Sequence, residues 1–449
     1  RRSRSGGRPL AWTAVVVADA RRGTPVTEGQ RGSVEPQPAR PGSAMGVMQS
    51  AGYRRLFYSA AATIFGVMAQ AVARGWLARD LTGSNAGLGG VFLAFGFAML
   101  LTTPFGGVAA DRFSKRRVLL VAVTLLIVSS LGIGLAVVTS TIQYWMLLVA
   151  SMVQAAAFAI YLPARIAFIA QVVEPDQIGP AVVLSQTAQE AMRVIAPALA
   201  GVLIGASWFG TGGLFLLAAA AVTVAGVVVL GLPPGAPVHE SHRSPLAELI
   251  DAVRYVRANQ SLGLVALTTI GVVDIGFPYL TFLPALADDR FGVGAAGYGV
   301  MAGAAGLGAV VAGIVAPRRG WVVATPWRTV AVSGAAVGVT IIALGFAPWF
   351  WLALVSVAAV GAAGLVFQTT TQSLMLALSD SEYHGRMQSM VVLGFSGFGL
   401  AALPLGAFAD AFTLELTMAA MGLLVIAVSV VFAAARRRHR RALVAVELA

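Results

Sequence analysis

The chain of 449 residues contains no cysteine and little charge. Without cysteine it cannot form disulfide bonds, thiolate zinc sites or iron–sulfur clusters. Charged residues make up 11% of the sequence, whereas soluble domains carry about 25%. Hydrophobic residues make up 58%, and the mean hydropathy is +0.82. This composition excludes a water-soluble globular protein.

Lysine is nearly absent too, and Lys115 is the only lysine of the sequence. A P-loop places a lysine directly after a glycine-rich turn, whereas Lys115 lies in Phe113-Ser114-Lys115-Arg116. The sequence therefore excludes a Walker-type ATPase within this chain. The four histidines fall in predicted loops or the C-terminal tail and show no metal-binding spacing. We expect no metal, no cofactor and no enzymatic activity.

The apolar residues come in blocks of about 20, the length that an α-helix needs to cross the hydrocarbon layer. The pattern predicts an all-α membrane protein with twelve transmembrane helices. They are expected at 57–78, 87–106, 117–138, 144–163, 181–205, 211–232, 262–286, 294–316, 328–346, 349–372, 387–409 and 413–434.

These spans divide the chain into segments. Residues 1–44 are rich in Arg, Pro, Gly and Ser, and we interpret them as a disordered tail or a mis-assigned start. Six-helix halves are expected at 45–232 and 262–434, followed by a basic tail at 435–449. The linker 233–261 has apolar residues at helical spacing, which predicts an amphipathic helix between the halves.

Arginine placement predicts the orientation in the membrane. From residue 45 onward, 19 of the 23 lysine and arginine residues fall in loops or tails on the side of the two termini. Because such residues concentrate on the cytoplasmic side, we expect both termini in the cytoplasm and the protein in the inner (plasma) membrane of a bacterium. This asymmetry accounts for the net charge of +12, so a nucleic-acid partner is not expected.

The two halves resemble each other in sequence. At an offset of 206 residues, Gly107-Val108-Ala109-Ala110-Asp111-Arg112 aligns with Gly313-Ile314-Val315-Ala316-Pro317-Arg318, and Tyr144-Trp145 aligns with Phe350-Trp351. One offset that recurs at separated loops predicts two parallel six-helix repeats. This is an architecture of secondary transporters, in which the substrate path lies between the halves.

The loop after the second predicted span reads Gly107-Val108-Ala109-Ala110-Asp111-Arg112-Phe113-Ser114-Lys115-Arg116-Arg117. It resembles the signature loop of the major facilitator superfamily, although Ala109 and Ser114 depart from that pattern. The resemblance implies alternating access, with a conformational latch made of Gly107, Asp111, Arg112, Lys115 and Arg116. The alternative is a basic loop that only sets the topology.

Two further segments narrow the resemblance. Leu162-Pro163-Ala164-Arg165 and Ala196-Pro197-Ala198-Leu199-Ala200-Gly201 are similar to elements of the enterobactin-exporter and macrolide-efflux branch. The second segment also suits close helix packing alone, because small residues let helices approach. Many drug–proton antiporters of the superfamily carry an arginine where this chain has Ser151. Either Arg193 supplies that positive charge in this chain, or its coupling of protons to substrate differs from that of those antiporters.

Four charged residues fall inside predicted spans, namely Arg74, Glu190, Arg193 and Asp274. A charge at the centre of a membrane helix costs about 2.5–3.5 kcal/mol on insertion scales, so function is the usual reason for keeping it. Glu190 and Arg193 share a helix face, and with Asp274 they lie about 15–20 Å deep at about 1.5 Å per residue. We expect Asp274, with Glu190 as second candidate, to bind and release a proton. The alternative is a neutral or salt-bridged structural group.

Polar and aromatic residues in the spans suggest an amphiphilic cavity for the substrate. The candidates are Gln70, Gln154, Phe158, Phe277, Tyr279, Phe367 and Phe395.

The resemblance implies a monomeric exporter of a small, largely hydrophobic molecule such as a drug, macrolide or siderophore, coupled to protons in antiport. The partners expected are this substrate, protons and the lipid bilayer. A proton-coupled importer of a metabolite, a membrane-embedded enzyme and a non-transporting sensor remain as alternatives. Gly292-Val293-Gly294-Ala295-Ala296-Gly297 fits a dinucleotide fingerprint, but it opens a membrane span without a preceding strand, so we do not expect it to bind a nucleotide.

Overall fold

The computed structural model describes residues 44–206, 208–236, 245–318, 325–380 and 384–447. Within these ranges every regular element is a helix. The predicted N-terminal tail, apart from Ala44, lies outside the described residues. The N-terminal half consists of α2 (Ala44–Val47), α3 (Ala51–Thr82), α4 (Asn85–Arg112), α5 (Lys115–Val138), α6 (Tyr144–Val172), η1 (Pro175–Gln177), α7 (Ile178–Gly205) and α8 (Gly210–Leu230).

The C-terminal half follows helix α9 (Pro245–Ala258), which lies in the predicted linker. It consists of α10 (Gln260–Gly276), α11 (Tyr279–Ala285), η2 (Leu286–Arg290), α12 (Gly294–Arg318), α14 (Pro326–Gly345), α15 (Phe350–Leu378), α16 (His384–Ala411) and α17 (Leu414–Glu447). Among the described residues, 11 helical segments are long and apolar enough to cross a membrane. At 28 residues, α16 has the length for a twelfth span.

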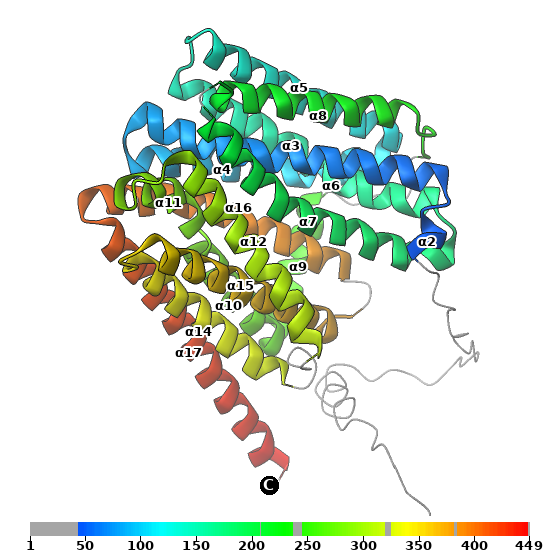
Figure 1. Cartoon of the computed structure of the whole chain (residues 1–449). Helices are drawn as coiled ribbons and strands as arrows, with labels where there is room; N and C mark the ends of the chain where they lie inside the picture. The colour runs from blue at the N-terminus through cyan, green and yellow to red at the C-terminus, as the bar shows by residue number, and fades with distance from the viewer. Residues whose placement is uncertain (1–43, 207, 237–244, 319–324, 381–383, 448–449) are drawn as a thin grey trace, which may run out of the picture.

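The two six-helix repeats are confirmed. Helices α6 and α15 are offset by 206 residues at both ends, and α7 and α16 by the same number. Figure 1 shows the two bundles side by side, with α3 to α8 in one and α10 to α17 in the other. Helix α2 and the C-terminal end of α17 lie toward the same end of the molecule, which we call the terminal end. The α3–α4 turn lies at the opposite end.

Local sequence explains how these helices begin and end. Ser50 and Ser84 cap α3 and α4, because each side-chain oxygen accepts a hydrogen bond from a backbone N–H in the first turn. Between these helices Gly83 has φ 61° and its N–H donates to the carbonyl of Arg79. Glycine adopts this left-handed conformation without a steric penalty, so the chain can reverse direction here.

The seventh span differs from the single helix predicted at 262–286. Helix α10 ends at Gly276 and α11 begins at Tyr279. Pro278 lies at the break and has no N–H for a helical hydrogen bond. The first turn after it is held by a hydrogen bond from the N–H of Leu280 to the carbonyl of Phe277. Proline therefore divides this span at about two thirds of its length.

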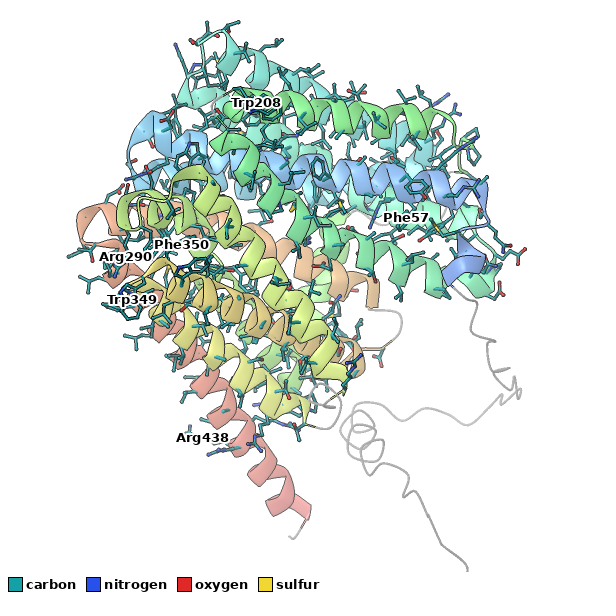
Figure 2. The ribbon with its side chains drawn as sticks, in the orientation of Figure 1. Phe57, Trp208, Arg290, Trp349, Phe350 and Arg438 are labelled. Carbon is teal, nitrogen blue, oxygen red and sulfur yellow. The ribbon has the colours of Figure 1, made fainter. Side chains whose placement is uncertain are left out.

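Aromatic side chains mark the end opposite the terminal end. Trp208, Trp349 and Trp351 are 81%, 69% and 76% exposed, as expected for tryptophans at a membrane interface. Figure 2 shows Trp208 and Trp349 at this end, together with Arg290, whereas Arg438 lies far along α17 toward the terminal end. Here the guanidinium of Arg290 pairs with Glu415 and donates to the carbonyl of Ala347.

Helix α9 lies at the terminal end, where it packs against α4 of one half and against α10 and α16 of the other. It is anchored to the end of α15, because the Tyr255 hydroxyl donates to Asp380 Oδ2 at 3.0 Å. Asn259 also donates to the carbonyl of Leu378 at 3.4 Å. The linker helix therefore contacts both halves.

Candidate functional site

The two halves touch along two seams, α4 with α16 and α7 with α12. Glycines bring the backbones together. A Cβ atom added at Gly96 would lie 2.6 Å from the carbonyl oxygen of Ser396. One added at Gly201 would lie 2.3 Å from the Cα atom of Gly299. The small residues predicted around Ala196 to Gly201 thus serve close packing between the halves.

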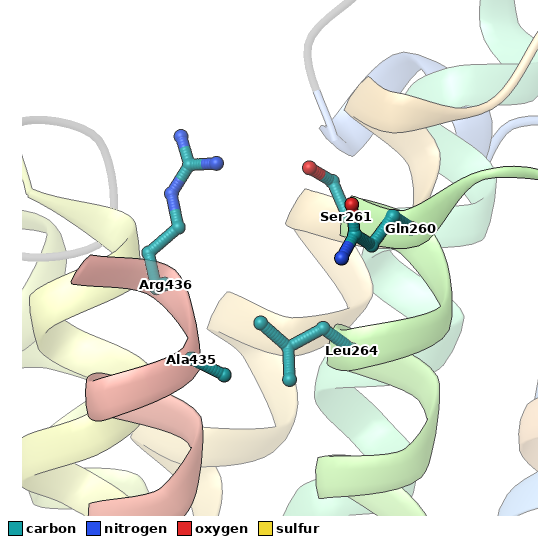
Figure 3. Close-up of a pocket in the computed structure, with 5 residues that line it drawn as sticks. All are labelled: Gln260, Ser261, Leu264, Ala435 and Arg436. Carbon is teal, nitrogen blue, oxygen red and sulfur yellow. The ribbon is translucent and has the colours of Figure 1, made fainter. Parts of the chain in front are cut away.

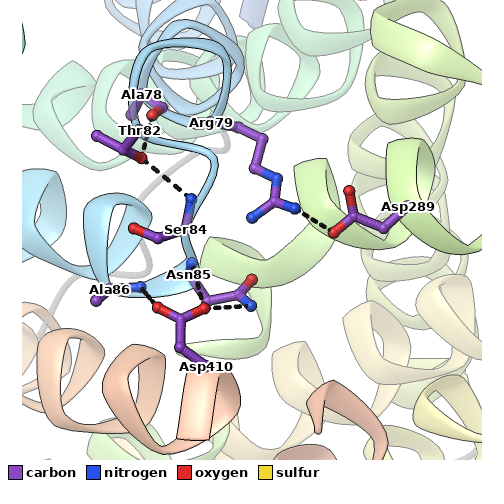
Figure 4. Close-up of polar contacts among 8 residues, drawn as sticks. All are labelled: Ala78, Arg79, Thr82, Ser84, Asn85, Ala86, Asp289 and Asp410. Carbon is purple, nitrogen blue, oxygen red and sulfur yellow. Dashed lines mark hydrogen bonds and ion pairs between the residues drawn. The ribbon is translucent and has the colours of Figure 1, made fainter.

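Polar contacts close the seams at the end opposite the terminal end. Arg79 of α3 pairs with Asp289 of η2. The carboxylate of Asp410 in α16 accepts from the backbone N–H of Asn85 at 2.8 Å, from its side-chain Nδ2 at 2.9 Å and from the N–H of Ala86 at 2.8 Å. Figure 4 shows both groups. A carboxylate is favoured at the N-terminus of a helix, so Asp410 fixes the start of α4 to the other half. We call these two contacts the closed end.

Removing Asp410 should open the closed end. Loss of an N-terminal cap costs about 0.5–2 kcal/mol, which would raise the open population about 2- to 30-fold. Because the chain has no cysteine, a single cysteine at buried Ala402 reports this opening by its rate of maleimide labelling. We expect faster labelling in Asp410→Ala than in the control Asp80→Ala, which removes an exposed carboxylate. Equal rates would contradict a role for Asp410 in closure.

The seam between α7 and α12 runs from the closed end toward the terminal end. On α12, contacts with α7 extend to Gly306, which lies against Val194. Beyond it Leu307, Val311 and Ile314 are more than half exposed. The larger buried cluster contains residues of both halves, whereas the second cluster lies within 47–232. The glycine contacts and the shared hydrophobic cluster that join the halves thus lie toward the closed end.

Glu190 and Arg193 lie on α7 beside this seam. Arg193 Nε lies 3.4 Å from Glu190 Oε1, and the side chains are 51% and 53% exposed for Glu190 and Arg193. Glu190 is one turn from Val194, so it shares the face that meets α12 farther along. At about 100° per residue, Arg193 lies nearly opposite the exposed apolar residues Ile195 and Val202. The pair therefore faces the space between the halves, not the side that Ile195 and Val202 occupy.

Arg74 occupies a different place. It is 5% exposed, and its guanidinium donates to Gln154 Oε1 and, at 3.5 Å, to Ser151 Oγ, both on α6. Ser151 is the position where the superfamily resemblance led us to look for an arginine. The sequence suggested Arg193 as the substitute, but the structure puts the guanidinium of Arg74 there. Arg193 pairs with Glu190 instead.

Asp274 of α10 is partly buried against α16. A Cβ atom at Gly397 would lie 2.1 Å from Asp274 Oδ2, so a larger residue there would force the carboxylate to move. The Oδ1 atom is buried and has no hydrogen-bond partner among the described residues. Nor does any hydrogen bond or ion pair described here join Asp274 to Glu190 or Arg193. The four predicted charges thus form three separate sites, one of them the Glu190–Arg193 pair.

The predicted cavity residues also separate. Gln70 and Gln154 are 2% exposed and belong to the layer around Arg74. Phe158 stacks on Tyr161, with 6.3 Å between ring centroids. Phe277 lies against Gly364 of α15. Tyr279 and Phe367 are buried in the larger hydrophobic cluster, so they pack the C-terminal half and do not line an open surface in this conformation. The side chain of Phe395 lies outside the described residues.

Among the residues of the predicted latch, the contacts of Arg116 stay within the N-terminal half. Lys115 is fully buried, and Arg112 is exposed. Arg116 donates from its guanidinium to the carbonyl of Leu232 at 3.0 Å and from its N–H to that of Pro234 at 3.1 Å. These bonds tie α5 to the segment after α8 in the same half. The surroundings of Gly107 and the side chain of Asp111 lie outside what the structure describes.

Sequence reasoning missed the environment of Arg165. This arginine of α6 is 2% exposed and lies beside α3 and α7. With its amide oxygen turned toward α6, Gln189 accepts from both terminal nitrogens of Arg165, at 3.2 and 2.6 Å. The nearby Tyr53 hydroxyl donates to the carbonyl of Ala181 at 2.8 Å. Arg165 therefore holds α6 against α7.

A small pocket lies at the terminal end between α10 and α17 (Figure 3). It is lined by Gln260, Ser261, Leu264, Ala435 and Arg436. The Arg436 guanidinium stacks over the Trp327 ring, 4.0 Å from its centroid. Within the described ranges, no group of three or more His, Asp or Glu side chains is arranged to hold a metal ion.

Comparisons with known proteins agree with this architecture. In solved structures, the chain resembles a POT family transporter in complex with a thioalcohol-conjugated peptide (TM-score 0.68, 13% identity, covering 86% of this chain and 96% of that one). It also resembles the nucleoside transporter NupG (TM-score 0.67, 14% identity, covering 86% and 98%). At these identities the likeness shows the fold alone.

Sequence comparison gives the family. An uncharacterized MFS-type transporter of Bacillus subtilis (strain 168), YfiS, is 26% identical over 145 residues, which cover 32% of this chain and 33% of YfiS. The match thus spans about a third of that relative. The sequence profile of the family described as transmembrane secretion effector matches residues 42–447. The chain is a membrane transporter that belongs to this family of the major facilitator superfamily.

Proposed function

We propose that the protein exports a small, largely hydrophobic molecule, of the drug, macrolide or siderophore type, in exchange for protons. The observation that carries the proton coupling is the Asp274 carboxylate, which lies in a membrane span with an unpartnered, buried Oδ1 atom. Burial disfavours the charged form of such a group. Neutralisation by a proton relieves that penalty, so protonation and the packing of α10 on α16 are linked. The family's description as a secretion effector supports export.

The orientation follows from the basic residues. With the terminal end in the cytoplasm, as the arginine distribution indicates, the closed end would face the outside. A substrate entering from the cytoplasm would meet Glu190 and Arg193 first, because both are half exposed between the halves. Closure of the cytoplasmic side would then engage the latch of Gly107, Asp111, Arg112, Lys115 and Arg116.

Reconstitution into liposomes tests the proposal. A panel of lipophilic dyes and antibiotics would be offered to vesicles with an imposed pH gradient. We expect at least one compound to move against its own gradient, and this flux to stop when an ionophore collapses the pH difference. Flux with the proton gradient, as substrate and proton move together, would instead indicate an importer. Absence of gradient-dependent flux for every panel member and for a metabolite panel would contradict proton-coupled transport.

A further inference from the structure

A buried polar layer surrounds Arg74 just below the closed end. Gln70 and Arg74 are one turn apart on α3, so they share a helix face. Gln154 and Ser151 reach the guanidinium of Arg74 from α6. Tyr298 of α12 completes the layer from the other half, since its hydroxyl lies 2.9 Å from a Cβ atom built at Gly75. Arg74 is five residues before Arg79, which forms part of the closed end.

This layer has more hydrogen-bond donors than acceptors. The Nε2 atoms of Gln70 and Gln154 are both buried and have no acceptor among the described residues. The oxygen of Gln154 already accepts from Arg74, which fixes its amide nitrogen as a donor. No ion pair that the structure describes joins Arg74 to a carboxylate. Its bonds are to the neutral side chains of Gln154 and Ser151.

Such an arrangement is unfavourable while it stays closed. A buried cation is normally paired with an anion, and a buried donor without an acceptor loses the hydrogen bond it had in water. A single acidic group would satisfy all three side chains, because guanidinium binds carboxylate and similar oxyanions through two parallel hydrogen bonds. The layer lies where the halves meet below the closed end, so separation of the halves there would admit such a group.

We propose that Gln70, Arg74 and Gln154 form an anion-binding site. It takes the acidic group of the transported molecule, or an inorganic anion, when the closed end opens. The inference rests on the proposed transport function and deepens it, since it makes the preferred substrate an amphiphilic acid over a neutral or cationic compound. The site is distinct from the Glu190–Arg193 pair and from Asp274.

Thermal unfolding of the purified full-length protein tests the site with defined probes. Sodium benzoate, sodium chloride and neutral benzamide would each be added at the same concentration to a buffer that contains no other carboxylate, so that sodium chloride also controls for ionic strength. We expect benzoate to raise the unfolding midpoint, because a ligand that binds the folded state stabilises it, and benzamide to leave it unchanged. A larger shift with benzoate than with chloride would assign the site to an organic acid. Equal shifts would assign it to an inorganic anion.

Two variants identify the residues. Arg74→Gln should lose the benzoate shift, whereas Arg437→Gln, which removes an exposed arginine, should keep it. Gln154→Glu supplies an internal carboxylate to Arg74, so it should raise the midpoint without any additive and abolish the response to benzoate. This second variant remains informative if Arg74→Gln fails to fold. Equal shifts with benzoate and benzamide, or a full benzoate response in Gln154→Glu, would overturn the site.

The outcome is separable from that of the transport proposal. A benzoate shift that depends on Arg74, without flux of any compound in liposomes, would leave the anion site standing and remove the transport function. If the pH gradient drove flux of neutral or cationic compounds only, and benzoate did not shift the unfolding midpoint, the transport function would stand and the anion site would be removed.

Discussion

Asp274→Asn should uncouple transport from the proton gradient. A difference of two pH units is worth about 2.7 kcal/mol per proton, enough to sustain a concentration ratio of about a hundredfold if one proton is exchanged per substrate. Asparagine has nearly the shape of a protonated aspartic acid but cannot release a proton. Accumulation in liposomes should therefore fall from as much as about a hundredfold to near equality, while passive exchange of substrate across the membrane persists.

Two further variants make this result specific. Asp176→Asn changes an exposed aspartate of η1 outside the spans and should accumulate substrate like the unchanged protein. Glu190→Gln breaks the pair with Arg193 and tests the second candidate under the same gradient. Full accumulation in Asp274→Asn would assign the coupling elsewhere. If Glu190→Gln alone removed accumulation, the proton site would lie on α7.

The fold was predictable because its determinants are local or repeat along the chain. Apolar blocks set the helices, and the offset of 206 residues in the sequence returns as identical offsets of α6 and α15 in the structure. The ion pair of Glu190 with Arg193 was predictable from a spacing of three residues on a helix. Pro278 was a local signal for the break in the seventh span, because proline lacks the N–H of a helical hydrogen bond. The prediction used hydropathy alone and therefore placed one unbroken helix there.

The contacts between halves were not predictable from such patterns. Asp410 meets Asn85 across 325 residues of sequence, and an aspartate near the end of a span looks like any residue of a loop. Arg74 was identified as a buried charge, but its partners depend on how α3 packs against α6. The same limit applied to Tyr279 and Phe367, which hydrophobicity alone could not assign to a core or to a cavity. Tertiary packing decides these questions.

Gly201→Val should force the closed end apart. The added Cβ atom would lie 2.3 Å from the Cα atom of Gly299 and 2.7 Å from its backbone nitrogen, so α7 and α12 must separate because neither backbone can yield. Overpacking of this kind costs about 1–3 kcal/mol, which corresponds to a rise of about 5- to 150-fold in the population open at that end. Maleimide labelling of a single cysteine at Ala402, on the other seam, measures that population.

Gly179→Val is the matched control on the same helix, because a Cβ atom at Gly179 meets nothing within 4 Å. It should label at the rate of the parent cysteine variant. If Gly201→Val also labels at that rate, the seam absorbs the side chain by a local shift and the two seams do not open together. Faster labelling confined to Gly201→Val would show that contact between α7 and α12 holds α4 against α16. The halves would then move as rigid bodies, which alternating access requires.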